Sequence, residues 1–301
     1  MKRRIKITLG VGLALLVVMI AVAYVAYREF VGAEAFDEGF YAAGAIHNSE
    51  FSYDSYAAAL RKHVDDKGMV SYAALKETTA ELHRFVRALA AVDTEMYEAW
   101  DEQAKIAFWI NAYNALTLKV IIDHYPIKAG LISGLAYPTS SIRQIPGVWD
   151  KSLFLVMGQR MTLDQIEHET LRARFNEPRI HVALVCAAMG CPPLRNEPFI
   201  GEKLDDQLDD QVKRFLTDPA KFRIDRDAGK VHLSSIFTWF GGDFVKTYKP
   251  AEGFASGGSD AAKAVLHLIS NYLPAEDAEY LKTGNYKVEY LDYDWSLNEQ
   301  N

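Results

Sequence analysis

The segment that organises the fold is Asp101–His124, which reads DEQAKIAFWINAYNALTLKVIIDH. Between Ile106 and Ile122 apolar residues occupy nearly every position, and a helix that is apolar on all sides is buried in a protein core. Pro126 follows shortly afterwards and ends the pattern, because a proline disfavours helical geometry in the residue before it. The sequence therefore predicts a central buried helix over residues 101–124.

Two amides interrupt this apolar segment. Asn111 and Asn114 are three positions apart, so they share one face of the predicted helix. A buried amide must find hydrogen-bond partners. Two interpretations follow: the amides fix the irregular segment 126–150, which is rich in Gly, Pro and Ser, or they stabilise a substrate oxyanion as catalytic residues.

Helical and strand patterns surround the central segment. Two amphipathic helices are predicted before it, at Tyr53–Lys67 and Tyr72–Val92, and a capped helix after it at 163–174. The predicted strands are two hairpins, a central strand and a late strand: Leu153–Leu163, Phe222–Leu233, Arg179–Cys186 and Tyr286–Tyr293. This mixture predicts an α+β fold, a helix-rich single domain with a small, largely antiparallel sheet.

The N-terminus differs in character from the rest of the chain. A basic cluster over residues 2–6 precedes residues 7–27, which contain no charged residue. A helix of that length spans the hydrocarbon core of a bilayer, so we expect one N-terminal transmembrane helix within residues 1–35. The alternative is a signal peptide cleaved near Ala33-Glu34-Ala35. Either interpretation exports a globular domain over 36–301, anchored to the membrane or secreted, on the periplasmic side in a bacterium.

Composition excludes several classes of function. The 301 residues carry a net charge of −7, and the basic N-terminal cluster leaves the remainder still more acidic, which argues against nucleic-acid binding. Two cysteines are too few for a multi-cysteine zinc module. Phosphate-binding and dinucleotide-binding glycine motifs and the HExxH motif are missing from the sequence, so we expect no cofactor and no metal.

Both cysteines lie in the segment Ile180–Arg195, which reads IHVALVCAAMGCPPLR. Three interpretations of Cys186 and Cys191 remain open. They can form a disulfide, since Gly190 permits a tight return of the chain in an oxidising compartment. Cys186 can be a nucleophile activated by a histidine, or both thiols can be packed and inert.

The predicted strand restricts which histidine serves Cys186. Side chains alternate along a strand, so His181 and Cys186 are expected on opposite faces and far apart. His168, on the predicted helix after Leu163, is then the better base, whereas Cys191 can fold back towards His181 after the turn.

Glu167 falls on the apolar side of the same predicted helix. A carboxylate that faces a core needs a partner, because otherwise its pKa rises until it is neutral. Glu167 either belongs to a polar catalytic site or pairs with an arginine, with Arg172, Arg179 or Arg195 as the available partners.

An aromatic segment ends in a Gly-flanked acid, with Trp239 and Asp243 in LSSIFTWFGGDF. Aromatic stripes usually belong to a core. Asp243 can nevertheless orient a catalytic histidine, and Trp239 and Arg195 are the candidates for contacts with a substrate.

These segments together resemble the uncharacterised domain-of-unknown-function 547 family. The resemblance spans residues 50–298 and rests on six ordered motifs: FWINAYNAL at 108–116, IEH at 166–168 with Leu171 and Arg172, PRIHVALVC at 178–186, CPPLR at 191–195, Leu233-Ser234 with Phe237 and Trp239, and YDWSLN at 293–298. It implies no established reaction. Its motif positions coincide with the residues that stand out on physical grounds.

Three functions follow. The first is a thiol-dependent hydrolase or acyltransferase of the cell envelope acting on peptides or amides, with Cys186 as nucleophile, a histidine as base and an asparagine on the oxyanion. The second is a non-catalytic, membrane-tethered binding or scaffold domain for an envelope protein, stapled by a Cys186–Cys191 disulfide. The third and least favoured is a redox role, because the cysteine spacing is not the C-x-x-C of thioredoxin-like proteins.

Overall fold

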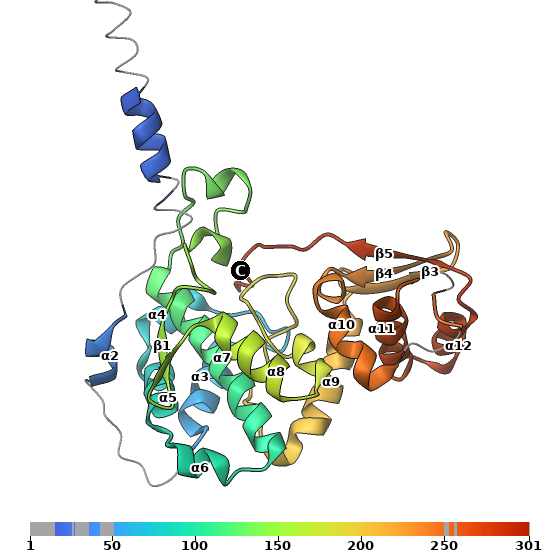
Figure 1. The fold of residues 1–301 in the computed structure, drawn as a ribbon, viewed down its shortest axis with the longest axis horizontal. Coiled ribbons are helices and arrows are strands. Elements are labelled where there is room, and N and C mark those ends of the chain that lie inside the picture. The colour runs from blue at the N-terminus through green and yellow to red at the C-terminus, as the bar shows by residue number, and fades with distance from the viewer. Residues whose placement is uncertain are drawn as a thin grey trace, which may run out of the picture.

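The central helix forms as predicted. In the computed structural model, which describes residues 16–25, 27, 36–42, 51–249, 253–255 and 258–300, α7 spans Glu102–His124 and is buried over most of its length. Asp101 caps it by accepting a 2.7 Å hydrogen bond from the amide of Ala104. Figure 1 shows α7 inside the larger of two lobes.

The short helices that precede α7 in the chain pack around it. They are α2 (Glu38–Ala42), α3 (Asp54–His63), α4 (Tyr72–Glu77), α5 (Ala80–Ala91) and α6 (Thr94–Glu98). The single helix predicted over 72–92 is two helices, because Thr78 turns its hydroxyl back onto the carbonyl of Ala74 and ends α4. We call this part, from α3 to residue 200, the α7 lobe.

The elements after α7 are short and partly irregular. The 3₁₀ turns η1 (Ser133–Leu135) and η2 (Ile142–Gln144) interrupt the loop 126–150, and β1 (Phe154–Val156) pairs antiparallel with β2 (Gln159–Met161). This hairpin was predicted, and both of its turn residues, Met157 and Gly158, have the positive φ of a tight hairpin turn.

The predicted helix after Leu163 exists, but its geometry differs. The capping box forms, since Thr162 and Gln165 exchange two side chain–backbone hydrogen bonds of 3.0 and 3.2 Å. Beyond the cap the chain winds as a π-helix, η3 (Gln165–Leu171), before one α-helical turn, α8 (Arg172–Arg174). A π-helix widens the turn and rotates the side chains away from α-helical positions.

The predicted central strand Arg179–Cys186 is wrong. Pro178 opens a 3₁₀ helix, η4 (Pro178–Val182), whose first free amide, that of Arg179, is capped by Glu177. The chain then continues to Cys186 without regular structure. A short apolar segment fits either a strand or another buried conformation, and among the described residues no strand pairs with it.

The second lobe is a small sheet packed on helices. The short turn η5 (Gly201–Lys203), which packs on α7, leads into it. The second lobe contains α9 (Leu204–Leu216), β3 (Phe222–Asp225), β4 (Lys230–Ser234), α10 (Ile236–Tyr248), α11 (Asp260–Ser270), α12 (Ala275–Thr283) and β5 (Lys287–Leu291). We call the part from α9 to β5 the sheet lobe. Its strands are ordered β3-β4-β5, and the predicted second hairpin and late strand are present.

The protein is helix-rich with two small sheets, and not all of the strand pairing is antiparallel. The pair β3–β4 is antiparallel, whereas β4–β5 is parallel, because α10, α11 and α12 intervene in sequence between the two strands. Buried apolar side chains form two clusters, one around α7 and one between the sheet and α10 and α11.

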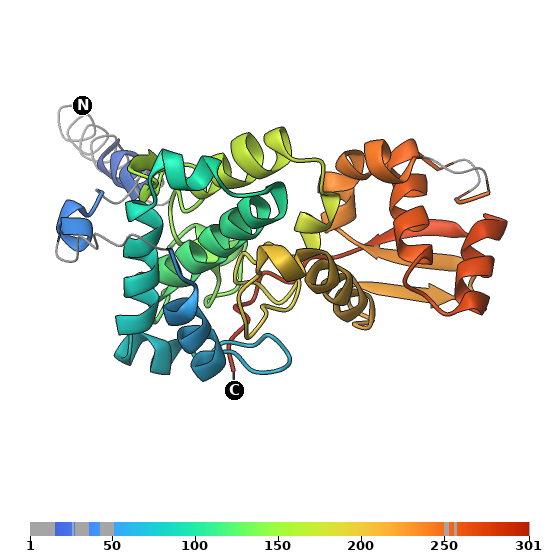
Figure 2. The ribbon, with the colours of Figure 1, turned by 90° about the horizontal axis from the view of Figure 1, so that it is seen from below.

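A C-terminal tail joins the two lobes. After β5, residues 293–300 run back to the α7 lobe, as Figure 2 shows. The tail forms bridges from Leu297 to Ala188 and from Glu299 to Val70. The side chain of Asn298 accepts a 2.6 Å hydrogen bond from the hydroxyl of Tyr72.

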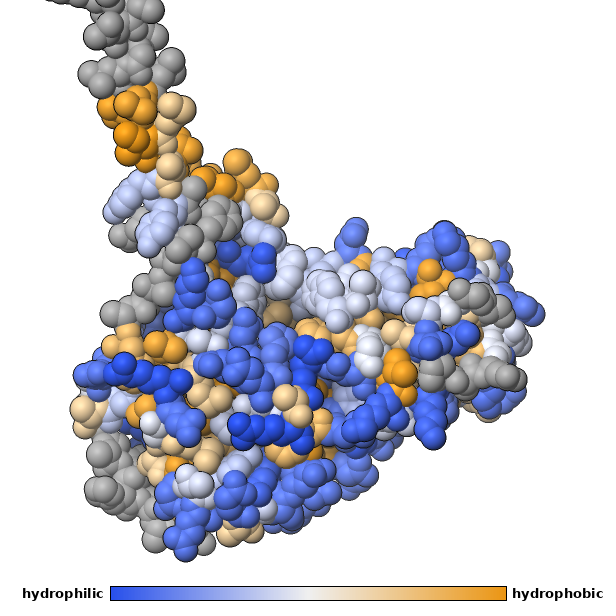
Figure 3. Space-filling model, in the orientation of Figure 1, coloured by the Kyte–Doolittle hydropathy of each residue, from blue (hydrophilic) through white to orange (hydrophobic). Residues whose placement is uncertain are grey.

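The predicted transmembrane helix is corrected by the structure. Residues 16–25 are helical, but none of the helices among the described residues is long and apolar enough to cross a membrane. The first part of the predicted span, residues 7–15, and the predicted cleavage site at 33–35 lie outside the described residues. Figure 3 shows an orange, hydrophobic patch over the described residues 16–25, whereas blue, hydrophilic residues and smaller hydrophobic patches are mixed on the same face of both lobes.

Candidate functional site

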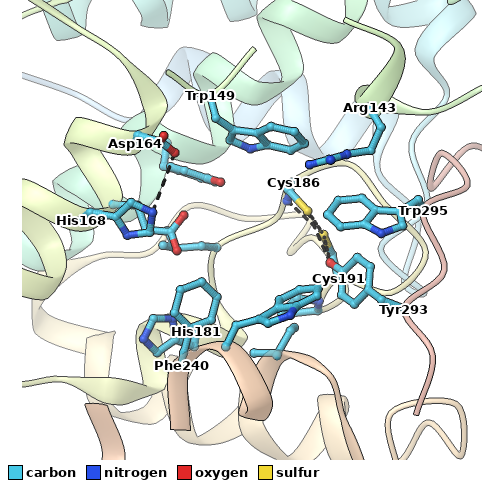
Figure 4. A pocket seen from close by; sticks show the side chains of 16 residues that line it. Arg143, Trp149, Asp164, His168, His181, Cys186, Cys191, Phe240, Tyr293 and Trp295 are labelled. Carbon is cyan, nitrogen blue, oxygen red and sulfur yellow. Dashed lines mark hydrogen bonds and ion pairs between the residues drawn. The ribbon is translucent and has the colours of Figure 1, made fainter. Parts of the chain in front are cut away.

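A pocket lies where the two lobes meet. It is a cavity of about 200 Å³, walled by Tyr113 of α7, the loop 126–150, η3, the segment 181–192, α10 and the C-terminal tail. Figure 4 shows two different walls: Cys186 and Cys191 lie beside Tyr293 on one, and Asp164 and His168 lie on the other. We call them the thiol wall and the acid wall.

The thiol wall depends on the amide of Asn114. Its Nδ2 donates to the carbonyl of Ala183 at 3.0 Å, and its Oδ1 accepts from the amide of Val185 at 2.9 Å. These two bonds replace the neighbouring strand that the segment 183–185 lacks. Asn114 therefore holds the backbone just before Cys186.

A tight turn then brings Cys191 back onto Cys186. Ala187 adopts a left-handed conformation with φ 59°, and the tail holds the turn through bonds to the amides of Met189 and Gly190. Gly190 is required here, because a Cβ at this position would lie 2.9 Å from the ring of Tyr293.

The two thiols lie in direct contact. Both cysteines are free, and their Sγ atoms are 2.7 Å apart, compared with about 2.05 Å in a disulfide. Cys191 Sγ accepts hydrogen bonds from the backbone amide of Cys186 at 3.0 Å and from the hydroxyl of Tyr293 at 3.1 Å. The hydroxyl also lies 3.4 Å from Cys186 Sγ.

These contacts make the two thiols unequal. Burial raises the pKa of Cys191, but the hydrogen bonds from Cys186 and Tyr293 outweigh it, so the pKa lies below its ordinary value. The hydrogen bond to Cys191, and then burial, raise the pKa of Cys186 well above its ordinary value. Cys191 is therefore the first of the pair to become a thiolate.

On the acid wall, the buried ring of His181 belongs to a partly exposed ion-pair cluster. Its Nε2 lies 2.8 Å from Oδ2 of Asp243, and Arg172 binds the same carboxylate through both oxygens at 2.6 and 3.0 Å. Burial raises the pKa of Asp243, but the bonds from His181 and Arg172 outweigh this and hold the pKa below its ordinary value. Burial lowers the pKa of His181, so the ring is neutral and donates to the carboxylate.

His181 and Cys186 line the same pocket, contrary to the prediction that they face apart. The reason is that the segment between them is a 3₁₀ helix followed by irregular chain, in which side chains do not alternate. Among the described residues, the contacts of the Cys186 and Cys191 sulfur atoms include no histidine. The histidine that Asp243 contacts is His181, through the 2.8 Å bond to Nε2.

His168 and Glu167 reach the pocket from the π-helix. Arg172 donates a 3.0 Å hydrogen bond to Nδ1 of His168, and Asp164 lies 3.8 Å from Nε2 of the same ring. Glu167 is only 8% exposed, and burial raises its pKa by more than the nearby Tyr113 and Arg172 lower it. Burial raises the pKa of Glu167 to about 7, so near neutral pH the group can give up or accept a proton.

Glu167 was expected to pair with an arginine if its role were structural. Among the described residues it makes no salt bridge, and Arg172, Arg179 and Arg195 bond to other carboxylates. Arg172 acts on Glu167 only as a nearby charge.

Four predicted site residues do not line the pocket: Asp243, which is connected to it through His181, and Asn111, Asn114 and Arg195. Asn111 pairs with the backbone of Phe199 through two bonds of 2.7 and 3.0 Å, and Asn114 pairs with residues 183 and 185. Both amides are therefore occupied by backbone, and neither holds the loop 126–150 or faces the cavity. Arg195 is paired with Glu197 and Asp210 in the core beside α9.

Trp239 does line the pocket and is 48% exposed. Its ring contacts Tyr293 and stacks on Trp295. Sequence reasoning missed the other large side chains of the cavity: Tyr113, Arg143, Trp149, Tyr293 and Trp295. The motif at 293–298 contains Tyr293 and Trp295 and could have drawn attention to both. Nothing in that motif indicates that Tyr293 contacts the cysteines.

The described residues contain no cluster of three or more His, Cys, Asp or Glu side chains arranged to hold a metal ion. Neither the curated proteins nor the solved structures contain a match to this chain. A family model does match residues 97–216, which include the cysteines, Glu167, His168 and His181 but not Asp243 or Tyr293. Over that range the chain resembles the family described as "Protein of unknown function, DUF547", which confirms the predicted resemblance over a shorter span than 50–298.

Proposed function

We propose that the protein catalyses thiol–disulfide exchange at Cys186 and Cys191. The observation that carries this proposal is the 2.7 Å contact between the two Sγ atoms in the wall of a cavity. A small approach of these atoms, with transfer of two electrons and two protons to a disulfide compound, gives a disulfide bond. This geometry favours the redox role over the hydrolase, because the sulfur atoms contact each other and a tyrosine rather than a base.

The inequality of the thiols assigns their roles. Cys186 is partly exposed and Cys191 is 2% exposed, so a substrate thiolate meets Cys186 first. Cys191 then leaves as a thiolate that accepts hydrogen bonds from the amide of Cys186 and from Tyr293. A stabilised leaving thiolate speeds the reaction and makes the enzyme disulfide more oxidising.

The exchange balances in two steps. In the first, a substrate thiolate attacks Sγ of Cys186 in the enzyme disulfide, the Cys186–Cys191 bond breaks, and Cys191 becomes a thiolate. In the second, another substrate thiolate attacks the substrate sulfur of the mixed disulfide, and Cys186 leaves and takes up a proton. Two substrate thiols are oxidised to one disulfide and the enzyme is reduced to its dithiol. A second disulfide compound reoxidises the enzyme by the reverse steps.

The test is an exchange assay with the full-length protein in a thiol and disulfide redox buffer, together with mass spectrometry of the trapped forms. We expect a reversible loss of two hydrogens in the wild type and turnover of a small-molecule thiol. Cys186→Ser should abolish turnover, and Cys191→Ser should accumulate the mixed disulfide on Cys186. A wild-type protein that keeps both thiols free under oxidising buffer overturns the proposal.

A second candidate is supported by the acid wall. Glu167, with its pKa near 7, lines the same cavity as Cys186. A cysteine-dependent acyl-transfer enzyme needs such a group, because a proton must be given to the leaving group of the peptide or amide. The two candidates separate on two variants. Hydrolysis requires Cys186 and Glu167 and tolerates Cys191→Ser, whereas exchange requires both cysteines and tolerates Glu167→Gln.

A further inference from the structure

Arg143 occupies an unusual position beside the thiol wall. It lies in η2, and its guanidinium carbon is 4.5, 5.4 and 5.1 Å from the ring centres of Tyr137, Trp149 and Trp295. Figure 4 shows the guanidinium between Trp149 and Trp295 on the side of the cavity where Cys186 lies. The aromatic rings thus hold a cation next to the reactive sulfur.

This cation has no anionic partner among the described residues. Nη2 of Arg143 donates to the hydroxyl of Tyr137 at 2.5 Å, and Nη1 and Nε make no hydrogen bond within the part of the chain that is described. By contrast, Arg172, Arg179 and Arg195 are each paired with carboxylates. The difference suggests that the partner of Arg143 is supplied by a ligand.

The loop is built to fix the backbone at Arg143. Ser141 accepts a hydrogen bond from the amide of Arg143. The side chain of Gln144 is buried and makes four bonds, accepting from Gly130 and Ser133 and donating to the carbonyls of residues 137 and 138. A guanidinium that is pre-positioned in this way loses little entropy when it binds a planar anion.

We infer that Arg143 binds a carboxylate of the substrate, so the substrate class is a thiol compound that carries a carboxylate close to its sulfur. This inference rests on the proposed exchange at Cys186. A guanidinium matches a carboxylate through two parallel hydrogen bonds, which Nη2 makes together with either Nε or Nη1. One N–H of Nη2 serves Tyr137, and its second N–H is left for a ligand together with Nε and Nη1. The exposed ring of Trp239 and the ring of Trp295 then cover the apolar part of the substrate.

The first measurement separates ligand binding from thiol chemistry. In the Cys186→Ser/Cys191→Ser protein, binding of the thiol-free acid phenylacetate is followed by tryptophan fluorescence, with phenylacetamide as its neutral counterpart. We expect the acid to bind about tenfold more tightly than the amide, and Arg143→Gln to remove that preference. Equal binding of acid and amide by this protein overturns the inference, whatever the outcome of the exchange assay.

The second measurement uses the active protein with mercaptoacetate and mercaptoacetamide. Arg143→Gln should raise KM for mercaptoacetate about tenfold and leave kcat nearly unchanged. KM for mercaptoacetamide should also stay nearly unchanged. Arg143→Lys should bring KM for mercaptoacetate part of the way back to the wild-type value. The matched control is Arg84→Gln, which removes an exposed arginine paired only with Glu81. A preference for acids in the binding experiment without turnover in the exchange assay keeps the carboxylate site and removes the exchange function.

Discussion

The two walls of the pocket satisfy their polar groups in opposite ways. On the thiol wall, Cys186, Cys191 and Tyr293 bond mainly to one another, and their ring of contacts faces the cavity. On the acid wall, His181 is turned onto Asp243, which Arg172 holds with two further bonds. The thiol wall therefore presents its sulfur atoms to the cavity. On the acid wall, Arg172 and His181 both bond to Asp243 and thereby connect α8, η4 and α10.

This difference indicates a division of labour. The ion-pair cluster of the acid wall ties the α7 lobe to the sheet lobe, whereas the thiol wall holds two groups at reacting distance. Glu167 is the exception, since it lies on the acid wall without a salt bridge and titrates near neutral pH. Four changes test the division, from the largest expected effect to the smallest.

Asn114→Ala should destabilise the thiol wall most. The change leaves the carbonyl of Ala183 and the amide of Val185 buried without partners, which costs about 3–5 kcal/mol of unfolding free energy. Urea unfolding measures the loss, and Asn285→Ala at an exposed position is the control. A loss below about 1 kcal/mol would mean that the segment before Cys186 is held by other contacts.

Glu167→Gln should change how stability depends on pH. The pKa of Glu167 rises from 4.5 to about 7 on folding, so between these values the folded protein binds more protons than the unfolded chain. Stability therefore falls as pH rises from 4.5 through 7 and is level above that, a decline on the order of 3 kcal/mol.

The glutamine variant should lose this decline, whereas Glu169→Gln on the same helix should keep it. Unfolding by urea at a series of pH values makes the comparison. Parallel curves for wild type and Glu167→Gln would show that the carboxyl is not the titrating group.

Asp243→Asn should loosen the acid wall by about 2 kcal/mol, because Arg172 and His181 lose a charged partner in a partly buried site. The exchange rate of the folded protein should stay within about twofold. Asp227→Asn is the control, since this residue is exposed. A large loss of turnover with unchanged stability contradicts the structural role that we assign to this wall.

Tyr293→Phe should have the smallest effect on stability and a selective effect on the thiols. Without the hydroxyl, the Cys191 thiolate loses one of its donors, so its pKa should rise. Ultraviolet absorbance of the thiolate, titrated with pH, measures this change. Tyr290→Phe, at an exposed tyrosine, should leave the titration where it is in the wild type.

Much of the local structure was predictable because neighbouring residues decide it. The cap at Asp101, the capping box at Thr162 and the turn at Met157-Gly158 form as their residue types predict. The strand predicted at 179–186 could not be excluded from the sequence, because a short apolar segment takes its conformation from the groups that pack against it. Here that group is the side chain of Asn114, which accepts a hydrogen bond from the amide of Val185. The π-helix under Glu167 leaves no periodic signal in the sequence.

The site was predicted in part. Cys186, Cys191, Glu167, His168, His181 and Trp239 do surround one cavity. The partners that give the thiols their inequality come from far away in sequence: Tyr293 reaches the cysteines over more than a hundred positions. Arg143 sits in a loop without a recognisable motif. Long-range placement of this kind depends on how the lobes pack, which single-sequence patterns do not encode.

The cysteine site depends on the C-terminal tail, which is synthesised after both cysteines. Residues 293–300 supply Tyr293, hold the turn that carries Gly190 and pair with Val70 near the opposite end of the described chain. A ribosome releases these residues only after every helix and strand of both lobes has been made. During synthesis the two cysteines therefore exist first without their hydroxyl partner and without the segment that holds their turn, so the dithiol site forms only after residues 293–300 have been made.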